Sequence, residues 1–351
     1  MKSKSFIISV VSLALAALIG IGGINILIDP LFLYHKPLFG LEPVITNERY
    51  QNAGIAKNFD FDNVIIGNSM SQNFKPSFFE DCFNGTTVKL TAAGSHAIDW
   101  TYLLEILEKR DKQPQNIIIN FDPFIFDTSA TETKHYLPDY LYDNNVLNDV
   151  NYLFNFSILK DYTFKTIKAN LNNSVPEIDR LFVWDDEKIK ADRFVLSDFD
   201  RADKVSDSPD IEDALNLAIE NVNLLIPYFE SMKETDFTLF FSPFSIVYWD
   251  EQNQLNKIEL WKTIYSKVCE ILVNYDNIHL YLWTDDAMMD IITTLDNYRD
   301  SSHYVSEISQ EIVSRITNQY GKLTPDNYLD EINKFFEFVG NYDYEQIFVG
   351  A

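Results

Sequence analysis

The sequence of 351 residues has few cysteines and few basic side chains. Its two cysteines, Cys82 and Cys269, belong to no Cys-x-x-Cys pair and no metal-ligand spacing, so a zinc site is not supported. A disulfide between them and two buried thiols both stay open. Lysine and arginine number 28 against 53 acidic residues, a formal net charge of -25. Such a surface repels phosphates, which disfavours a role in nucleic acid binding.

Internal repeats and low-complexity segments are also absent from the sequence. The chain is 46% hydrophobic and 15% aromatic, and disordered chains lack this density of Phe and Tyr. The composition therefore predicts one large globular domain, or such a domain with an insertion.

Charge is missing from one long stretch near the N-terminus. Residues 6–28 carry no charged side chain and follow Lys2 and Lys4. About 20 apolar residues span a bilayer, and a cleaved signal peptide has a shorter apolar core, so residues 1–28 are predicted to be an uncleaved signal anchor. The lysines before the span and Asp29 after it predict a cytoplasmic N-terminus. We therefore expect a single-pass protein of the cell membrane whose main domain is extracytoplasmic.

Short apolar runs alternate with amphipathic stretches through much of the remaining chain. Five runs are predicted to be strands: 63–67, 87–91, 116–120, 237–241 and 278–282. Helical spacing of apolar residues is found at 97–110, 211–232, 254–273, 305–317 and 325–339. This alternation predicts a three-layer α/β fold with a mainly parallel five-stranded sheet.

Two segments interrupt the alternation. Residues 29–60 begin with Asp-Pro and are interpreted as a membrane-proximal connector. Residues 127–207 are rich in Asp, Asn and Tyr and are too long for a plain loop, so they predict a mostly helical insertion after the third strand. Because it leaves the ligand-binding edge of the sheet, it is either a lid or acceptor-binding element, or a decorative subdomain. Residues 61–126 and 208–351 would then form the α/β domain.

Ser69 follows the first predicted strand, two residues past Gly67. This position places its hydroxyl at the carboxyl edge of the sheet, beside backbone N–H groups that can stabilise an oxyanion. A serine hydroxyl needs a neighbouring base to act as a nucleophile. A serine in this position alone more often caps a helix than attacks a substrate.

Asp300 and His303 supply the groups that such a nucleophile needs. They stand in a polar turn after the last predicted strand and before a helix. At this spacing one segment can aim a carboxylate and an imidazole at the same place, where the carboxylate orients the ring and the ring takes the serine proton. We therefore predict Ser69, His303 and Asp300 as catalytic residues. His96 is a possible site-lining residue, with a structural role as its alternative.

These residues resemble the sequence blocks of the SGNH/GDSL hydrolase superfamily. The run Gly67-Asn-Ser-Met is similar to the first block, Gly-Asp-Ser-Leu, and Asp300-Ser-Ser-His is similar to the terminal block, Asp-x-x-His. Gly94 matches the glycine of the second block. The resemblance covers residues 61–318. It implies a flavodoxin-like domain in which the N–H groups of Ser69 and Gly94 form the oxyanion hole.

The third block departs from the superfamily pattern, Gly-x-Asn-Asp, whose asparagine donates to the oxyanion. This chain has Asn120-Phe-Asp-Pro, which puts Asp122 at the asparagine position. An ionised carboxylate cannot donate a hydrogen bond and opposes a developing negative charge. Asp122 is therefore either protonated or turned aside, or the Ser69 and Gly94 amides form the hole alone. Asn120 and Asn68 are candidate substitutes, and Asn68 and Asp122 would line the site.

The chain is also similar to the membrane-anchored branch of this superfamily, which includes alginate-type O-acetyltransferases and proteins that transfer D-alanine to lipoteichoic acid. The shared features are one N-terminal span, an external domain and a degenerate third block. This resemblance implies a serine acyltransferase or esterase that acts on cell-envelope polysaccharide, uses no metal or other cofactor, and works beside a membrane-bound O-acyltransferase. The alternative is a non-catalytic scaffold or assembly protein of a glycan-modifying complex, and Asp122 is its best support.

Overall fold

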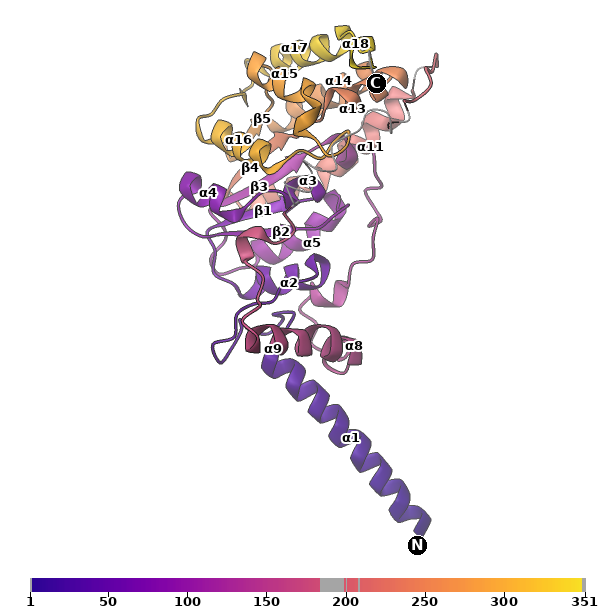
Figure 1. Ribbon diagram of the computed structural model, residues 1–351, viewed down its shortest axis with the longest axis vertical. Helices are drawn as coiled ribbons and strands as arrows, with labels where there is room; N and C mark the ends of the chain where they lie inside the picture. Colours follow the sequence, from indigo (N-terminus) through magenta and orange to yellow (C-terminus); the bar gives the residue numbers. More distant parts are fainter. Residues whose placement is uncertain (1, 184–198, 200, 208, 349–351) are drawn as a thin grey trace. The chain divides into compact units, whose positions relative to one another are not determined.

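A computed structural model describes residues 2–183, 199, 201–207 and 209–348 of the chain (Figure 1). The part of the predicted insertion at 184–198 lies outside the described residues. The chain divides into two compact units. Unit 1 is Met1–Asp60 with Tyr136–Leu181, and unit 2 is Phe61–His135 with Phe182–Ala351.

Unit 2 contains a six-stranded sheet in the order β2-β1-β3-β4-β5-β6. The strands are β1 Asn63–Gly67, β2 Thr87–Thr91, β3 Asn116–Phe121, β4 Asp236–Phe241, β5 Ile278–Tyr281 and β6 Lys322–Leu323. All neighbouring pairs run parallel except β5 and β6, which are antiparallel. The predicted α/β class and the mainly parallel sheet are confirmed.

The predicted number of five strands is wrong, because β6 is a sixth. It has two residues, and they pair with the edge strand β5 through Leu280 with Leu323 and Tyr281 with Lys322. Two residues cannot produce an alternating pattern in a sequence, so this pairing depends on the neighbouring strand.

Helices fill the connections between the strands. The chain steps from β1 to β2 in one direction across the sheet and from β2 to β3, β4 and β5 in the other. Because such crossovers are right-handed, the two directions place their helices on opposite faces. The first crossover is α4 Pro76–Phe83, which packs on α16 Ser306–Thr317. The others are α5 Ala97–Glu108, α11 Ile211–Asn223, α12 Ile226–Ser231 and α14 Ile258–Leu272.

Two predicted helices differ from those observed. The pattern at 211–232 is divided into α11 and α12, since Pro227 stands in the first turn of α12 and cannot continue the preceding helix. The pattern at 254–273 begins later, at Ile258. The other helices among the described residues of unit 2 are α3 Ser69–Gln72, α6 Pro123–Phe126, α13 Ile246–Gln254, α15 Asp286–Thr293, η5 Leu295–Asn297, α17 Tyr328–Asn341 and α18 Glu345–Phe348.

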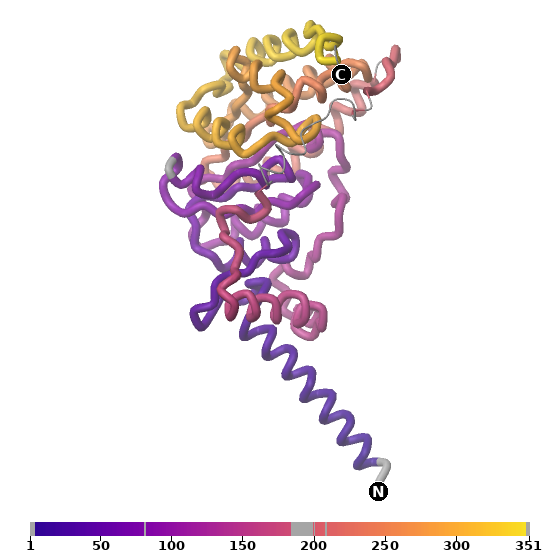
Figure 2. Tube along the Cα trace, viewed as in Figure 1, coloured from indigo at the N-terminus to yellow at the C-terminus, as the bar shows by residue number. Residues whose placement is uncertain are grey.

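Unit 1 begins with the long helix α1, Lys2–Ile28 (Figure 2). Its stretch Lys4–Ile28 has 25 residues and is long and apolar enough to cross a membrane. At a rise of 1.5 Å per residue it measures about 37 Å, against a hydrocarbon core of about 30 Å. The other helices of this unit are α2 Glu48–Asn58, η1 Asp139–Leu141, α7 Val150–Leu153, α8 Phe156–Ile158, η2 Leu159–Thr163, α9 Phe164–Leu171 and η3 Ile178–Arg180.

A buried polar cluster joins the end of α1 to residues 150–163. Asp29 is fully buried, and its carboxylate accepts the Tyr152 hydroxyl at 2.6 Å and the backbone N–H of Tyr34 at 2.7 Å. Asn25 accepts the Thr163 hydroxyl at 2.8 Å. The expected connector and residues 136–181 of the expected insertion therefore belong to one compact unit, a grouping that the local sequence does not indicate.

Candidate active site

The turn between β1 and α3 carries Ser69 at the carboxyl end of a central strand. β1 and β3 are neighbours, while the chain between them passes through β2 on the other side, so their carboxyl ends form the switch point where α/β sheets bind ligands. Asn68 caps α3 by accepting the Met70 N–H at 2.9 Å. A Cβ on Gly67 would overlap side-chain atoms of Asn120 and Ser71, so only glycine fits this strand end.

The loop from Tyr298 to Tyr304 carries the other two predicted residues. Asp300 shapes it by accepting the backbone N–H groups of Ser302 at 2.9 Å and His303 at 2.8 Å. The Arg299 N–H donates to the His303 carbonyl at 2.8 Å and closes the loop. The aspartate therefore fixes both the backbone around the histidine and the ring itself.

Side chains from other elements hold this loop at the sheet edge. Tyr298 donates its hydroxyl to the Pro243 carbonyl at 2.8 Å. Ser245 donates to the Ser301 carbonyl at 2.7 Å, and Asn73 donates to the Tyr304 carbonyl at 2.9 Å. Tyr298 and Tyr304 are fully buried, so the loop has a packed base.

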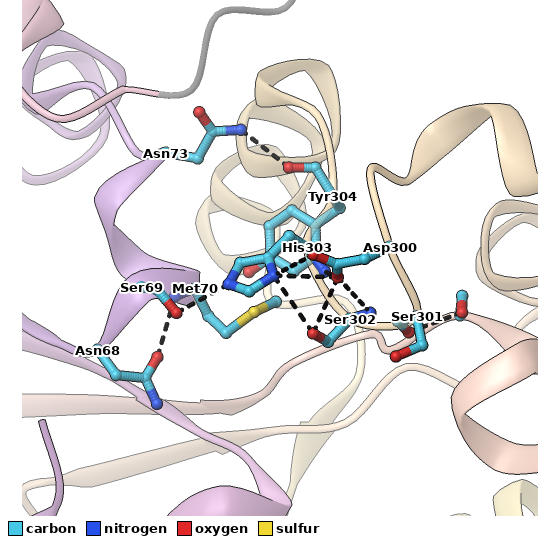
Figure 3. A network of polar contacts seen from close by, with 10 residues as sticks. Asn68, Ser69, Met70, Asn73, Asp300, Ser301, Ser302, His303 and Tyr304 are labelled. Atoms are coloured by element: carbon cyan, nitrogen blue, oxygen red, sulfur yellow. Dashed lines mark hydrogen bonds and ion pairs between the residues drawn. The ribbon is translucent and has the colours of Figure 1, made fainter. Parts of the chain in front are cut away.

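Ser69, His303 and Asp300 lie in one hydrogen-bonded line (Figure 3). Ser69 Oγ is 2.8 Å from His303 Nε2, and His303 Nδ1 is 2.8 Å from Asp300 Oδ2. An ionised carboxylate only accepts, so Nδ1 carries the ring proton and Nε2 of the neutral ring accepts the serine hydroxyl. The three residues predicted from the sequence are thus brought together in the order that proton transfer from a serine requires.

The charge of Asp300 suits this arrangement. Burial alone would raise its pKa, but hydrogen bonds from the His303 ring, the charge of that ring and the loop N–H groups lower the pKa to about 2. The carboxylate is therefore ionised near neutral pH and stabilises a protonated His303. The His303 side chain is 22% exposed, which leaves its ring accessible from solvent.

Asp122 points into a buried hydrogen-bond network beside the Ser69 turn. Its carboxylate accepts from Asn68 Nδ2 at 2.9 Å, from Asn120 Nδ2 at 2.6 Å and from the Phe124 N–H at 3.0 Å, where it caps α6. Asn120 in turn accepts the Ser71 hydroxyl at 2.5 Å. Asp122 and Asn120 are both fully buried. Of the possibilities for Asp122, the geometry matches the carboxylate that is turned aside.

The network also affects the ionisation of Asp122. Burial raises its pKa to about 6, against hydrogen bonds from Asn68 and the Phe124 N–H, which lower it. His303 lies close enough for its charge to lower this pKa as well. The carboxylate of Asp122 is therefore linked to the serine through Asn68 and to the histidine through charge.

The remaining predicted site residues make no hydrogen bond to Ser69, His303 or Asp300 among the contacts described above. Gly94 follows β2 with a φ of +64°, and a Cβ there would lie 2.8 Å from His135 Nε2. His96 is buried at the cap of α5, where its N–H donates to Asp99 at 3.0 Å. The buried Asn120 donates to Asp122 and, at 3.2 Å, to Asn68, so its amide is directed into the network. The structure therefore does not bring Asn120 to the accessible side of Ser69.

Several residues of the site give no signal in the sequence. Ser302 donates its hydroxyl to Asp300 at 3.1 Å, and His135 covers Gly94. Asn73, directly after α3, and Ser245, directly before α13, anchor the histidine loop from more than 50 positions away. Only the place of Ser302 inside the Asp-x-x-His spacing could have pointed to it.

Within the described residues, no group of three or more His, Cys, Asp or Glu side chains is arranged to hold a metal ion. Cys82 and Cys269 are free thiols. No protein-family model matches the sequence, and no curated protein matches it. The chemistry of this chain is therefore inferred from the geometry around Ser69.

Proposed function

We propose that this chain is a membrane-anchored serine acyltransferase or esterase of SGNH type that acts on cell-envelope polysaccharide. One observation carries the proposal: the line from Ser69 Oγ through the His303 ring to Asp300, with 2.8 Å at each step. A serine that only caps a helix does not require a histidine within hydrogen-bond distance. A structural aspartate–histidine pair likewise does not require a partly exposed serine, as Ser69 is.

In the proposed reaction, Ser69 Oγ attacks the carbonyl carbon of an acyl ester while His303 Nε2 takes its proton. The tetrahedral intermediate collapses when the bond to the leaving alcohol breaks and His303 returns the proton to that alcohol. A sugar hydroxyl or water then attacks the Ser69 ester, again with His303 as base. Transfer and hydrolysis differ only in this second nucleophile.

The oxyanion hole is assigned to the backbone N–H groups of Ser69 and Gly94. Backbone donors that are fixed before reaction stabilise the negative charge of the intermediate without reorganisation. The position of Gly94, in a left-handed turn that suits glycine, is compatible with this role. The inward orientation of Asp122 removes the objection that an exposed carboxylate would oppose the oxyanion.

The membrane and the polysaccharide enter the proposal through α1 and the family resemblance. Lys2 and Lys4, in the first turn of α1 and before its apolar stretch, favour a cytoplasmic N-terminus and an extracytoplasmic domain. A tether near a membrane-bound O-acyltransferase would raise the effective concentration of the acyl donor. The acceptor is then a glycan of the cell envelope.

The proposal is tested with the purified full chain in detergent micelles. The chain is given 4-nitrophenyl acetate, with and without a short oligosaccharide, and nitrophenolate and acetylated sugar are both measured. A burst of nitrophenolate is expected from the wild type and from Ser301→Ala, a neighbouring serine of the histidine loop, but not from Ser69→Ala. Equal slow release from the wild type and Ser69→Ala, with both chains folded, would favour the non-catalytic scaffold instead.

A further inference from the structure

Large apolar side chains are exposed on one segment of unit 1, residues 146–171. They are Val146, Leu147, Val150, Phe154, Phe156, Phe164 and Leu171. The exposed fractions of the Phe156 and Leu171 side chains are 64% and 78%. A contiguous set of exposed large apolar residues marks an interaction surface rather than an ordinary solvated face.

This segment packs against the last turns of α1. Gly22 and Asn25 of that helix, with Asp29 directly after it, form a buried stripe, while residues 23, 24, 26 and 27 are exposed. Phe154 covers the first position of the stripe: a Cβ on Gly22 would lie 3.0 Å from its ring. Asn25 Nδ2 donates to the Leu153 carbonyl at 2.9 Å. α7 and η2 contact α1 and cover its polar side. Figure 1 shows α8 and α9 running across the C-terminal end of α1.

The contact with Gly22 sets the depth of the segment. Gly22 precedes Ile28, the last residue of α1, by six positions, which is about 9 Å along a helix. If α1 spans the bilayer, as the proposed function requires, the Phe154 ring lies deeper than the point where α1 leaves the membrane. The segment that carries this ring cannot then be wholly in water.

Exposed aromatic and lysine side chains follow one another along this segment. Phe156, Lys160, Phe164 and Lys168 follow one another at intervals of four residues, and all four are exposed. Lysine stems can lie along apolar surface while the ammonium groups reach lipid phosphates. Residues 159–171 have three lysines and one aspartate, whereas the whole chain has a net charge of -25. Residues 159–171 therefore have a small net positive charge, unlike the chain as a whole.

We propose that residues 146–171 lie in the interface of the bilayer that α1 crosses, on its extracytoplasmic side. Phe156, Phe164 and Leu171 enter the acyl-chain boundary, and the lysines contact lipid phosphates. Unit 1 is then attached to the membrane by the transmembrane helix α1 and by a second segment that lies parallel to the membrane plane. The second segment fixes the distance of unit 1 from the bilayer. This inference depends on the anchorage proposed above.

The test measures the depth of nitroxide labels on the full chain in phosphatidylcholine–phosphatidylglycerol vesicles. The background is Cys82→Ser, since Cys269 is fully buried. Labels are placed through Phe156→Cys and Phe164→Cys, with Leu15→Cys as a reference in α1 and Tyr320→Cys as an exposed aromatic of unit 2. Collisions with oxygen, which dissolves in lipid, are compared with collisions with a water-soluble nickel complex.

We expect the labels at 156 and 164 to collide with oxygen and to lose collisions with nickel, as the label at 15 does and the label at 320 does not. Free nickel access at 156 and 164, with the label at 15 in lipid, would overturn the interfacial segment alone. Nickel access at 15 would overturn the anchorage and the inference together. Labels at 156 and 164 that collide with neither reagent would indicate that a second copy of the chain, and not lipid, covers these positions. That result would also overturn the interfacial segment.

Discussion

At the scale of residues, Asp300 determines the geometry of the candidate site. Asp300 and His303 are three positions apart, and the aspartate accepts hydrogen bonds from two backbone N–H groups of the loop between them. The contact between the carboxylate and the ring is therefore local, and the Asp-x-x-His spacing was enough to predict it. Ser69 is 234 positions from His303, and the family resemblance together with the predicted strand ends connected them. The orientation of Asp122 depends on Asn68 and Asn120, which no local pattern reveals.

Asp300→Asn tests the role of the carboxylate. An amide can present an N–H to His303 Nδ1 and favour the wrong ring tautomer, so ester hydrolysis should fall by roughly a hundredfold to ten-thousandfold. The comparison is Ser302→Ala, which removes a hydroxyl that contacts the same aspartate at 3.1 Å and should change kcat by less than about tenfold. Equal rates for Asp300→Asn and the wild type would contradict the assignment.

Asp122 should make stability depend on pH between about 4 and 6. Its pKa is raised to about 6 in the folded chain, from 3.8, so between these values the folded state holds a proton that the unfolded state has released. Stability therefore falls as pH rises through this window, by about 3 kcal/mol from this group. Asp300, whose pKa is lowered to about 2, acts with the opposite sign and only below pH 4.

The measurement is the free energy of unfolding at pH 4, 5, 6 and 7 for the wild type and Asp122→Asn. The difference between the two chains removes the titration of all other groups. The wild type should gain stability relative to the variant as the pH falls from 7 to 4. A difference that stays constant over this range would show that Asp122 does not titrate in it.

At the scale of elements, the strands were the most predictable feature. β1, β3 and β4 are apolar and almost completely buried, and their bounds agree with the predicted ones to within one residue. β6 was not predicted, because two residues are too few to show the alternation of a strand. α11 and α12 were predicted as one helix, because the helical spacing of apolar residues continues past the break at Pro227. The predictions failed where a tertiary contact or a proline, rather than the periodicity, decides the bounds.

The turn between β1 and α3 should not tolerate a side chain at its glycine. Gly67→Ala forces a methyl group against Asn120 and Ser71, so it should cost about 1–3 kcal/mol of stability and reduce Ser69 activity. The matched control is Gly340→Ala in α17, where the nearest atom would be 3.7 Å away and alanine should stabilise by about 0.5–1 kcal/mol. Thermal unfolding and ester hydrolysis check both variants.

At the scale of the whole molecule, the two compact units could not be inferred from the sequence. Unit 1 joins residues 1–60 to residues 136–181 through polar contacts such as Asn25 with Tyr152, which are 127 positions apart. The sequence indicated the apolar helix and the insertion separately. Contacts between residues so far apart in the chain produce no periodic pattern in the sequence. The packing of the apolar helix against the insertion is therefore seen only in the folded chain.

Tyr152→Phe tests the junction inside unit 1. Loss of the hydroxyl that donates to the buried Asp29 at 2.6 Å should destabilise this unit by about 1–3 kcal/mol. Limited proteolysis within residues 136–181 should become faster, while Tyr320→Phe, at an exposed position, should leave it unchanged. Hydrolysis at Ser69 should persist, because Ser69, His303 and Asp300 belong to unit 2.

The central claim is that Ser69 is a nucleophile activated by His303. The most direct measurement is the mass of the full chain after treatment with a fluorophosphonate, followed by peptide mapping. One adduct on Ser69 is expected in the wild type and Ser301→Ala, none in Ser69→Ala, and much slower labelling in His303→Asn. An adduct on another residue, or a folded wild-type chain that does not react, would contradict the claim.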